Sequence, residues 1–268
     1  MPSSNPAFKG LGGAGNGQQY AGWNAQPQYG APADPYAAPS PYAATGTQYM
    51  TMDDVVTKTG LTFLVTVLTA AATWMAVPDE VAIGLLFPAV IVGLILGLVI
   101  SFKQIANPVA TLSYAAIQGV LVGAISEFYA ENFSYNLITQ AVIGTFGVFF
   151  GMLVVYKTGA IRVTPKLTRW IVGALFGVLA LMLVNLVASF FTDGGLGLRD
   201  GGPIAILFSL VVIGVAAFTL LLDFDMADEA IRRGAPAKFA WYISFGLLLT
   251  VVWLYLEILR LLSYLQSE

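Results

Sequence analysis

The feature that most limits what this chain can fold into is a series of long apolar stretches. Each is about as long as the roughly 20 residues of helix that the hydrocarbon core of a bilayer requires. We place seven of them at residues 60–77, 81–102, 108–130, 134–156, 168–191, 203–224 and 237–264. Charged residues make up only 10% of the chain, against about 25% in soluble domains. The sequence therefore predicts an all-α membrane protein, a bundle of seven transmembrane helices joined by short connections.

The distribution of Lys and Arg predicts how this bundle is oriented. Cytoplasmic loops of membrane proteins carry an excess of both residues. With the N-terminus inside, the inner segments hold Lys9, Lys58, Lys103, Lys157, Arg162, Lys166, Arg169, Arg232, Arg233 and Lys238. The outer segments then hold only Arg199 and Arg260. We therefore expect a multi-pass protein of the cell membrane with its N-terminus inside and its C-terminus outside.

The N-terminal segment differs in composition from the rest of the chain. Gly, Pro, Ala, Gln, Ser and Tyr dominate it, and such a segment buries too little apolar surface to offset the entropy of ordering. We expect a disordered cytoplasmic tail over residues 1–52 and a membrane domain over residues 53–268. The tail does not read as a cleaved signal peptide, because no cationic stretch followed by an apolar one opens the chain.

The absence of two residue types narrows the possible chemistry. The chain has no Cys and no His, which excludes thiol catalysis, Cys/His zinc sites and Ser-His-Asp triads. Its formal net charge is -3 and its basic residues are scattered, so no nucleic-acid-binding surface is indicated. We expect a protein that is not an enzyme, needs no cofactor and binds no nucleic acid.

Glycine recurs four residues apart in four of the predicted spans. The pairs are Gly93 and Gly97, Gly119 and Gly123, Gly147 and Gly151, and Gly173 and Gly177. Small residues at this spacing let two helix backbones approach closely in a membrane. We expect these pairs to be packing faces rather than ligand sites.

Polar residues inside the spans are the candidates for function, because a charge at the centre of a bilayer is costly. Four are neutral and are expected to hydrogen-bond across helices: Gln118, Gln140, Asn185 and Ser189. Glu127 and Glu131 lie near the outer end of the third span, where we expect them to be solvated. Glu257 lies three residues before Arg260 on one helix face, so the two can form an ion pair. The alternatives are that Arg260 extends to the outer interface or that Glu257 serves transport.

The sixth span ends on four carboxylates, followed by two arginines: Asp223, Asp225, Asp228, Glu229, Arg232 and Arg233. We interpret Asp228 and Glu229 as an acidic helix end balanced by the arginines, or as solvated loop charges. Asp223 and Asp225 lie among apolar residues and are about 200° apart on a helix, so we expect only one of them to face the bundle. That residue, for which we place Asp225 first, could bind a cation or a proton.

Four segments also form an ordered set: QGVLVGAIS from Gln118, QAVIGT from Gln140, Phe224-Asp225 at the end of the sixth span and Leu254-Tyr-Leu-Glu257 in the last. With the seven-span layout, this set resembles the Bax inhibitor/YccA-like family, also called the transmembrane Bax inhibitor motif family. The resemblance covers about residues 52–266. The Gly- and Pro-rich tail is similar to that of a bacterial subgroup of this family.

The resemblance implies a pH-sensitive calcium leak, with six helices around a central hydrophobic one and a gate formed by two acids in the last two spans. The first acid corresponds to Asp225 or, nearly as well, to Asp223. The second corresponds to Glu257, where the family commonly has Asp. Gln118, also a candidate pathway residue, stands where the family often has Glu. The separation of Asp225 and Glu257 is roughly two helical turns longer than in the family, and our spans place them at opposite ends, so we expect no contact.

Two functions follow from these observations. In the first, the protein is a passive cation leak in which Asp225 or Asp223 gates the inner side and Glu257 lines the path, since carboxylate oxygens suit Ca²⁺. In the second, it is a membrane regulator that transports nothing and binds other membrane proteins, such as a protease, through its tail and helix faces. The expected partners are therefore membrane lipid, Ca²⁺ or protons, and other membrane proteins.

Overall fold

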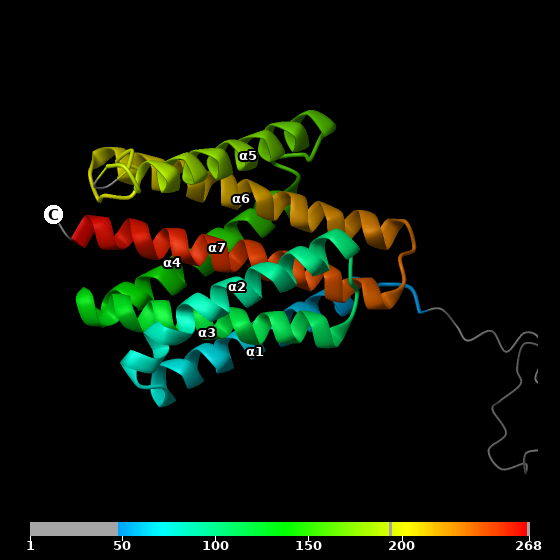
Figure 1. Cartoon of the computed structure of the whole chain (residues 1–268). Coiled ribbons are helices and arrows are strands. Elements are labelled where there is room, and N and C mark those ends of the chain that lie inside the picture. Colours follow the sequence, from blue (N-terminus) through cyan, green and yellow to red (C-terminus); the bar gives the residue numbers. More distant parts are fainter. Residues whose placement is uncertain (1–47, 193–194, 267–268) are drawn as a thin grey trace, which may run out of the picture. The chain divides into compact units, whose positions relative to one another are not determined.

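The computed structural model of the chain describes residues 48–192 and 195–266. Their helices are α1 (Met52–Ala76), α2 (Asp79–Lys103), α3 (Pro108–Asn132), α4 (Tyr135–Thr158), α5 (Pro165–Ala188), α6 (Pro203–Arg232), the short 3-10 helix η2 (Ala237–Phe239) and α7 (Ala240–Gln266). The seven α-helices are each long and apolar enough to cross a membrane (Figure 1). This confirms the predicted all-α membrane fold. The expected tail falls outside the described residues except for its last few.

Local signals fix where α1 begins. Thr51 Oγ1 accepts a hydrogen bond from Asp54 N at 3.2 Å, and the Asp54 carboxylate accepts one from Thr51 N at 3.1 Å. This reciprocal arrangement is a capping box, which satisfies free N–H groups at a helix start. An ion pair of 3.0 Å between Lys58 and Asp54 follows one turn later. The helix therefore begins at Met52 and not at residue 60, which the apolar pattern predicted.

The sixth span is also longer than predicted. It continues as α6 to Arg232 instead of ending at residue 224. Asp228 pairs with Arg232, and Glu229 pairs with Arg233 at 2.6 Å, each one turn apart. Pairs at this spacing stabilise helices, so the charged residues extend the helix beyond the apolar run. The expectation of an acidic helix end balanced by the arginines is confirmed, and that of loop charges is wrong.

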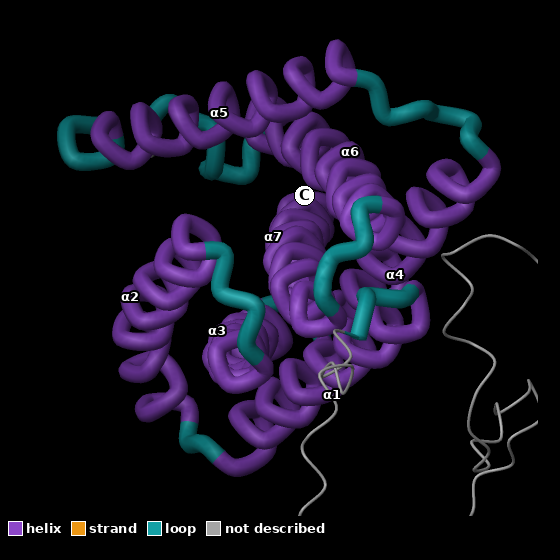
Figure 2. Tube along the Cα trace, turned by 90° about the vertical axis from the view of Figure 1, so that its right-hand side faces the viewer, coloured by secondary structure: helices purple, strands orange, loops and turns teal. Residues whose placement is uncertain are grey.

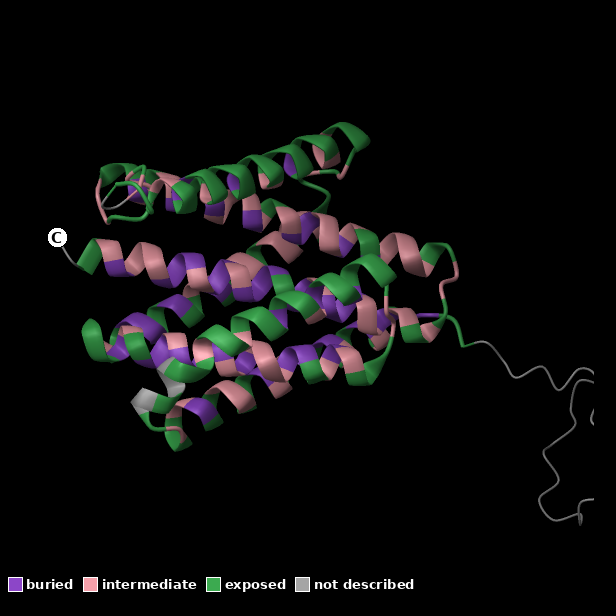
Figure 3. Cartoon of the chain, viewed as in Figure 1, coloured by how far each residue is buried: buried purple, intermediate pink, exposed green. Residues whose placement is uncertain are grey.

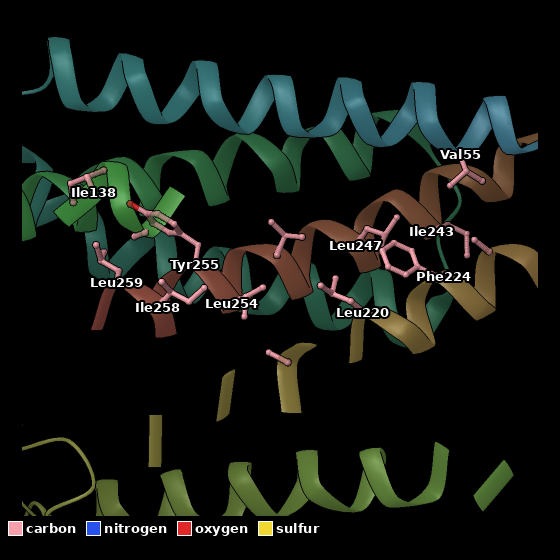
Figure 4. Packing of buried hydrophobic residues seen from close by; sticks show 14 of the residues in the cluster. Val55, Ile138, Leu220, Phe224, Ile243, Leu247, Leu254, Tyr255, Ile258 and Leu259 are labelled. Carbon is pink, nitrogen blue, oxygen red and sulfur yellow. The ribbon is translucent and has the colours of Figure 1, made fainter. Parts of the chain in front are cut away.

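The last helix lies at the centre of the bundle. Figure 2 shows α7 between α1, α3, α4 and α6, and each of these four helices packs against it. Its side chains make up much of the apolar core, including Leu247, Leu254 and Leu259, which belong to one cluster with Leu220 and Phe224 of α6 (Figure 4). α2 packs chiefly on α3, and α5 chiefly on α6. α5 therefore exposes most of its surface, as Figure 3 shows.

Two of the four glycine pairs are packing faces. A Cβ at Gly119 would lie 2.5 Å from the backbone oxygen of Thr66, and one at Gly123 would lie 2.5 Å from that of Ala70. The absence of side chains at both positions therefore lets α3 lie directly against the α1 backbone. On the α2 side, a Cβ at Gly97 would lie 3.2 Å from the Tyr114 ring.

The other two pairs do not pack within the described part of the chain. A Cβ at Gly147, Gly151, Gly173 or Gly177 would meet no described atom within 4 Å. The expected packing is therefore found within the chain for α2 and α3, whereas for α4 and α5 it stays a prediction about contacts with another molecule. All four pairs have the same four-residue spacing in the sequence. Whether a pair packs against a neighbouring helix therefore depends on the position of its helix in the bundle.

The basic residues gather at one end of the bundle. This basic end comprises the C-terminal ends of α2, α4 and α6 and the N-terminal ends of α1, α3, α5 and α7, with Lys103, Lys157, Lys166, Arg232 and Lys238. Arg199 and Arg260 lie toward the opposite end. The predicted orientation depends on this grouping of Lys and Arg at one end. Which end faces the cytoplasm stays a prediction.

A short segment before α1 is attached to the same end. Met50 N donates to Ala235 O, and Ala237 N donates to Gln48 O, both at 2.7 Å. Lys58 Nζ also donates to Ala237 O at 2.7 Å. The Met50 side chain is buried. Gln48 and Met50, near the end of the segment predicted to be a disordered tail over residues 1–52, thus bind the connection between α6 and α7, so the expectation of disorder is wrong for these last residues.

Candidate functional site

Asp223 joins α6 to the central helix near the basic end. Thr250 Oγ1 of α7 donates a hydrogen bond of 2.6 Å to Asp223 Oδ2. Gly246, one turn earlier on α7, faces the other carboxylate oxygen, and a Cβ at this glycine would lie 3.7 Å from Asp223 Oδ1. Asp223 therefore lies against the face of α7 that carries Gly246 and Thr250.

The Asp223 carboxylate also faces a cavity of about 170 Å³, here called the Asp223 pocket. It is lined by Ser101 of α2, Asp223 and Met226 of α6, and Tyr242, Ile243, Phe245, Gly246 and Leu249 of α7. Tyr242 OH donates a long hydrogen bond of 3.5 Å to Ser101 O, across the pocket's α2 side. Residues of three helices therefore line a small cavity beside one carboxylate, and it is large enough for several water molecules.

Asp225 points in a different direction from Asp223. Tyr156 OH of α4 lies 3.5 Å from Asp225 Oδ1 and 3.2 Å from Asp228 Oδ2, and can donate to either. The two aspartates thus contact different helices, as their separation around the helix predicted. The sequence placed Asp225 first, but Asp223 is the residue that lines the pocket and contacts α7.

Glu257 lies in a separate cluster toward the opposite end of α7. Its side chain is 2% exposed. Arg260 Nη1 donates to Glu257 Oε1 at 2.7 Å, which confirms the predicted ion pair. Arg199 Nη2, from the connection between α5 and α6, is 3.9 Å from the same oxygen. Partial burial and the positive charge of Arg260 lower the pKa of Arg199.

The second carboxylate oxygen of Glu257, Oε2, is buried and inaccessible to solvent. Among the described residues, Oε2 has no hydrogen-bond partner although it is buried. The arginine that neutralises Glu257 sits on its other oxygen. As it stands, this carboxylate is engaged in a structural ion pair.

Asp223 and Glu257 do not form a two-acid site. Asp223 binds Thr250, and Glu257 follows Thr250 by two helical turns, about 10 Å along α7. The expectation that Asp225 and Glu257 do not touch holds equally for Asp223. The resemblance implies a contact between two acidic residues, whereas here the acid Asp223 contacts the hydroxyl group of Thr250.

Gln118 is linked to the pocket only indirectly. Its Nε2 donates to Tyr114 OH at 2.7 Å, one turn earlier on α3. The Tyr114 ring meets Phe245 edge to face, with centroids 4.7 Å apart, and Phe245 lines the Asp223 pocket. Gln118 therefore helps to hold a wall of the pocket and does not line it.

The sequence did not single out Thr250, which binds Asp223, or the polar residues Tyr242 and Ser101, which line the pocket. Thr250 is a hydroxyl in an otherwise apolar run, Leu247-Leu-Leu-Thr-Val-Val252. Such a residue usually bonds its own helix, and Thr250 also donates to Gly246 O at 3.2 Å. Nothing in the run indicates that it reaches a carboxylate on another helix.

Comparisons with known proteins agree with the fold. A family model described as Bax inhibitor 1 like matches residues 5–267. The match extends further toward the N-terminus than residues 52–266, on which the resemblance rested. A search of curated proteins finds no match.

Proposed function

The chain belongs to the Bax inhibitor 1 like family, and from this premise we propose that it is a passive, pH-sensitive cation leak of a bacterial plasma membrane, with calcium as its cation. The chain is a multi-pass membrane protein with seven helices that can span a bilayer. Its leak activity, its ion and the membrane in which it resides are what we propose. Residues of the Asp223 pocket are its candidate gate.

The observation that carries the proposal is a carboxylate facing a cavity between three helices. Carboxylate oxygens are the ligands that hard cations such as Ca²⁺ prefer. Among the described residues, no group of three acidic side chains could hold a metal ion. A single carboxylate binds a cation weakly, and weak binding suits a conducting site because the ion must leave again. Protonation of Asp223 would neutralise the site and make it sensitive to pH.

The other acidic residues receive different roles under this proposal. Asp225 and Asp228 lie beside Tyr156 of α4 at the same end of α6, where their charge raises the local concentration of cations. Glu257 is not assigned to the path, because Arg260 already neutralises it. Gln118 supports the pocket through Tyr114 and Phe245.

Calcium flux into liposomes tests the proposal. The purified protein is compared with Asp223→Asn and Asp225→Asn at several pH values on either side of neutrality. We expect a pH-dependent flux in the wild type that loses its pH dependence in Asp223→Asn and keeps it in Asp225→Asn. Asp228→Asn is the control, because this residue is an acid at the same end of α6 that is paired with Arg232 and does not line the Asp223 pocket. Absence of flux in the wild type would rule out the leak.

A second candidate function is a regulator that binds other membrane proteins and transports nothing. The observation that favours it is α5, which packs chiefly on α6 and leaves the face of Gly173 and Gly177 open. Small residues on an open helix face are suited to contact another transmembrane helix. Gly173→Leu should then abolish co-purification of a partner such as a membrane protease while leaving the fold intact. A chain without residues 1–46 tests the contribution of the tail in the same assay.

Neither function requires catalysis. The chain has no Cys and no His, and a hydrolase would need a nucleophile activated by a base or a metal. We therefore propose a protein that is not an enzyme, whose partners are lipid, cations or protons and other membrane proteins.

A further inference from the structure

A second cavity lies on another side of the bundle, between α1 and α4. It has a volume of about 300 Å³. Val67, Ala70 and Ala71 of α1 form one wall, and Val142 and Phe146 of α4 form the other. The floor comes from α3 and from the central helix α7. We call this cavity the α1–α4 groove.

Aromatic pairs close both ends of the groove. Phe63 of α1 meets Phe149 of α4 edge to face, with ring centroids 6.1 Å apart and planes at 71°. At the other end Trp74 of α1 stacks on Tyr135 of α4, with centroids 6.1 Å apart and planes at 15°. Between Phe63 and Trp74 the two helices leave an open slot, roughly 16 Å long along α1.

The lining of the groove suits only an apolar occupant. None of the described side chains that line it is charged. Its hydroxyl groups are already bonded within the protein: Thr145 Oγ1 donates to Ala141 O at 2.7 Å. On the floor, the hydroxyls of Ser126 and Tyr255 bond each other at 2.7 Å. An occupant would therefore find chiefly apolar surface.

The groove opens toward the lipid and not toward water. Val67 and Val142, which lie on its two rims, are 57% and 40% exposed, and both belong to membrane-spanning helices. At the inner side, Ile138 of α4 and Tyr255 of α7 both line the groove and belong to the buried apolar cluster (Figure 4). Whatever fills the groove thus enters sideways from the hydrocarbon core of the bilayer.

The dimensions distinguish a hydrocarbon chain from a partner helix. A helix with side chains is about 10–12 Å across, whereas rings that touch at both ends hold α1 and α4 together. A flexible hydrocarbon chain is thinner than a helix and can lie in this slot between the two ring pairs. From this geometry we propose that the α1–α4 groove binds one acyl chain of a bilayer phospholipid as a specific ligand. This inference is independent of the proposed leak, since it shares no residue with the Asp223 pocket.

Photo-crosslinking in a bilayer tests the proposal. The full chain is reconstituted into vesicles of phosphatidylethanolamine and phosphatidylglycerol that contain a phosphatidylcholine with a diazirine in its acyl chain. After illumination, adducts are mapped by mass spectrometry. We expect adducts at Val251 and Tyr255, which are 8% and 7% exposed and line the groove floor. Leu183 of α5, which is 54% exposed, reports labelling by ordinary surrounding lipid.

Matched variants show whether the chain enters through the groove. Ala71→Phe fills it from α1, and Ala72→Phe adds the same ring at the next residue, which is exposed and does not line the groove. Val142→Phe and Ile143→Phe form the corresponding pair on α4.

The filling variants should lose the floor adducts and keep those at Leu183, whereas the two controls should keep both. Two results would overturn the proposal: no floor adducts in the wild type, or floor adducts that persist in a folded filling variant. If either Ala71→Phe or Val142→Phe does not fold, the remaining filling variant and the adducts mapped in the wild type still test whether an acyl chain enters the groove.

Discussion

At the scale of single residues, Asp223 is held by one hydroxyl group from another helix. A hydrogen bond to a charged group contributes about 1.5–3 kcal/mol to stability. Thr250→Val keeps the shape of the side chain and removes the donor that lies 2.6 Å from Asp223. We expect the free energy of unfolding in detergent to fall by about this amount. Thr250→Ser, which retains the hydroxyl group, should lose much less.

A double-mutant cycle separates this bond from other effects of the substitutions. In Asp223→Asn the carboxylate is replaced by a neutral amide, so the further change Thr250→Val should cost less than it does in the wild type. Residues in direct contact commonly show coupling of about 0.5–3 kcal/mol. Effects that simply add would mean that the hydroxyl group and the carboxylate do not depend on each other, and the pocket would lose its proposed support.

At the scale of helices, α3 can lie directly against the backbone of α1 because Gly119 and Gly123 have no side chains. Gly119→Ala places a Cβ 2.5 Å from the backbone oxygen of Thr66, and overpacking of this kind costs about 1–3 kcal/mol. Gly147→Ala, on the open face of α4, meets no described atom within 4 Å. It should be neutral or stabilising, because Ala favours a helix by about 1 kcal/mol over Gly.

Thermal unfolding of the two glycine variants in the same detergent checks this difference. A lower Tm for Gly119→Ala and an equal or higher Tm for Gly147→Ala is the expected result. Similar losses in both variants would contradict it, and would indicate that the α4 face is covered by another chain or by tightly held lipid.

The same elements show what the sequence can and cannot predict. The number and order of the helices follow from the long apolar stretches of the sequence. In a bilayer, a helix is one of the few structures that satisfy all backbone hydrogen-bonding groups, so each stretch of this length predicts one helix. The ends of α1 and α6 were missed, since Asp54 and Asp228 resemble loop residues until their pairing with Lys58 and Arg232 is known. Charged residues at a helix end extend the helix into water, where apolar length no longer limits it.

At the scale of the whole molecule, the arrangement of helices around α7 decides which residues meet. The contact between Asp223 and Thr250 depends on how α6 and α7 are rotated about their axes. Sequence periodicity does not determine that rotation, because apolar residues face both the core and the lipid. For the same reason the sequence could name the acids of the candidate site and could not name Thr250, Tyr242 or Ser101.

The asymmetry of charge between the two ends predicts how the whole bundle lies in the membrane. Lys103, Lys157 and Lys238 belong to the basic end, and Lys and Arg remain on the cytoplasmic side during insertion. The chain has no Cys, so a single introduced thiol reports its own position. Lys238→Cys places an exposed thiol in η2, just before the central helix, and Gln266→Cys places one at the end of that helix.

Labelling of intact cells with a maleimide that cannot cross membranes then gives the orientation. We expect Gln266→Cys to react in intact cells and Lys238→Cys to react only after the membrane is broken. The reverse pattern would place the Asp223 pocket on the external side, where calcium is abundant and a carboxylate would meet the cation at its entry. Reaction of both thiols in intact cells would instead mean that α7 does not span the membrane, which would remove the basis for the helix arrangement itself.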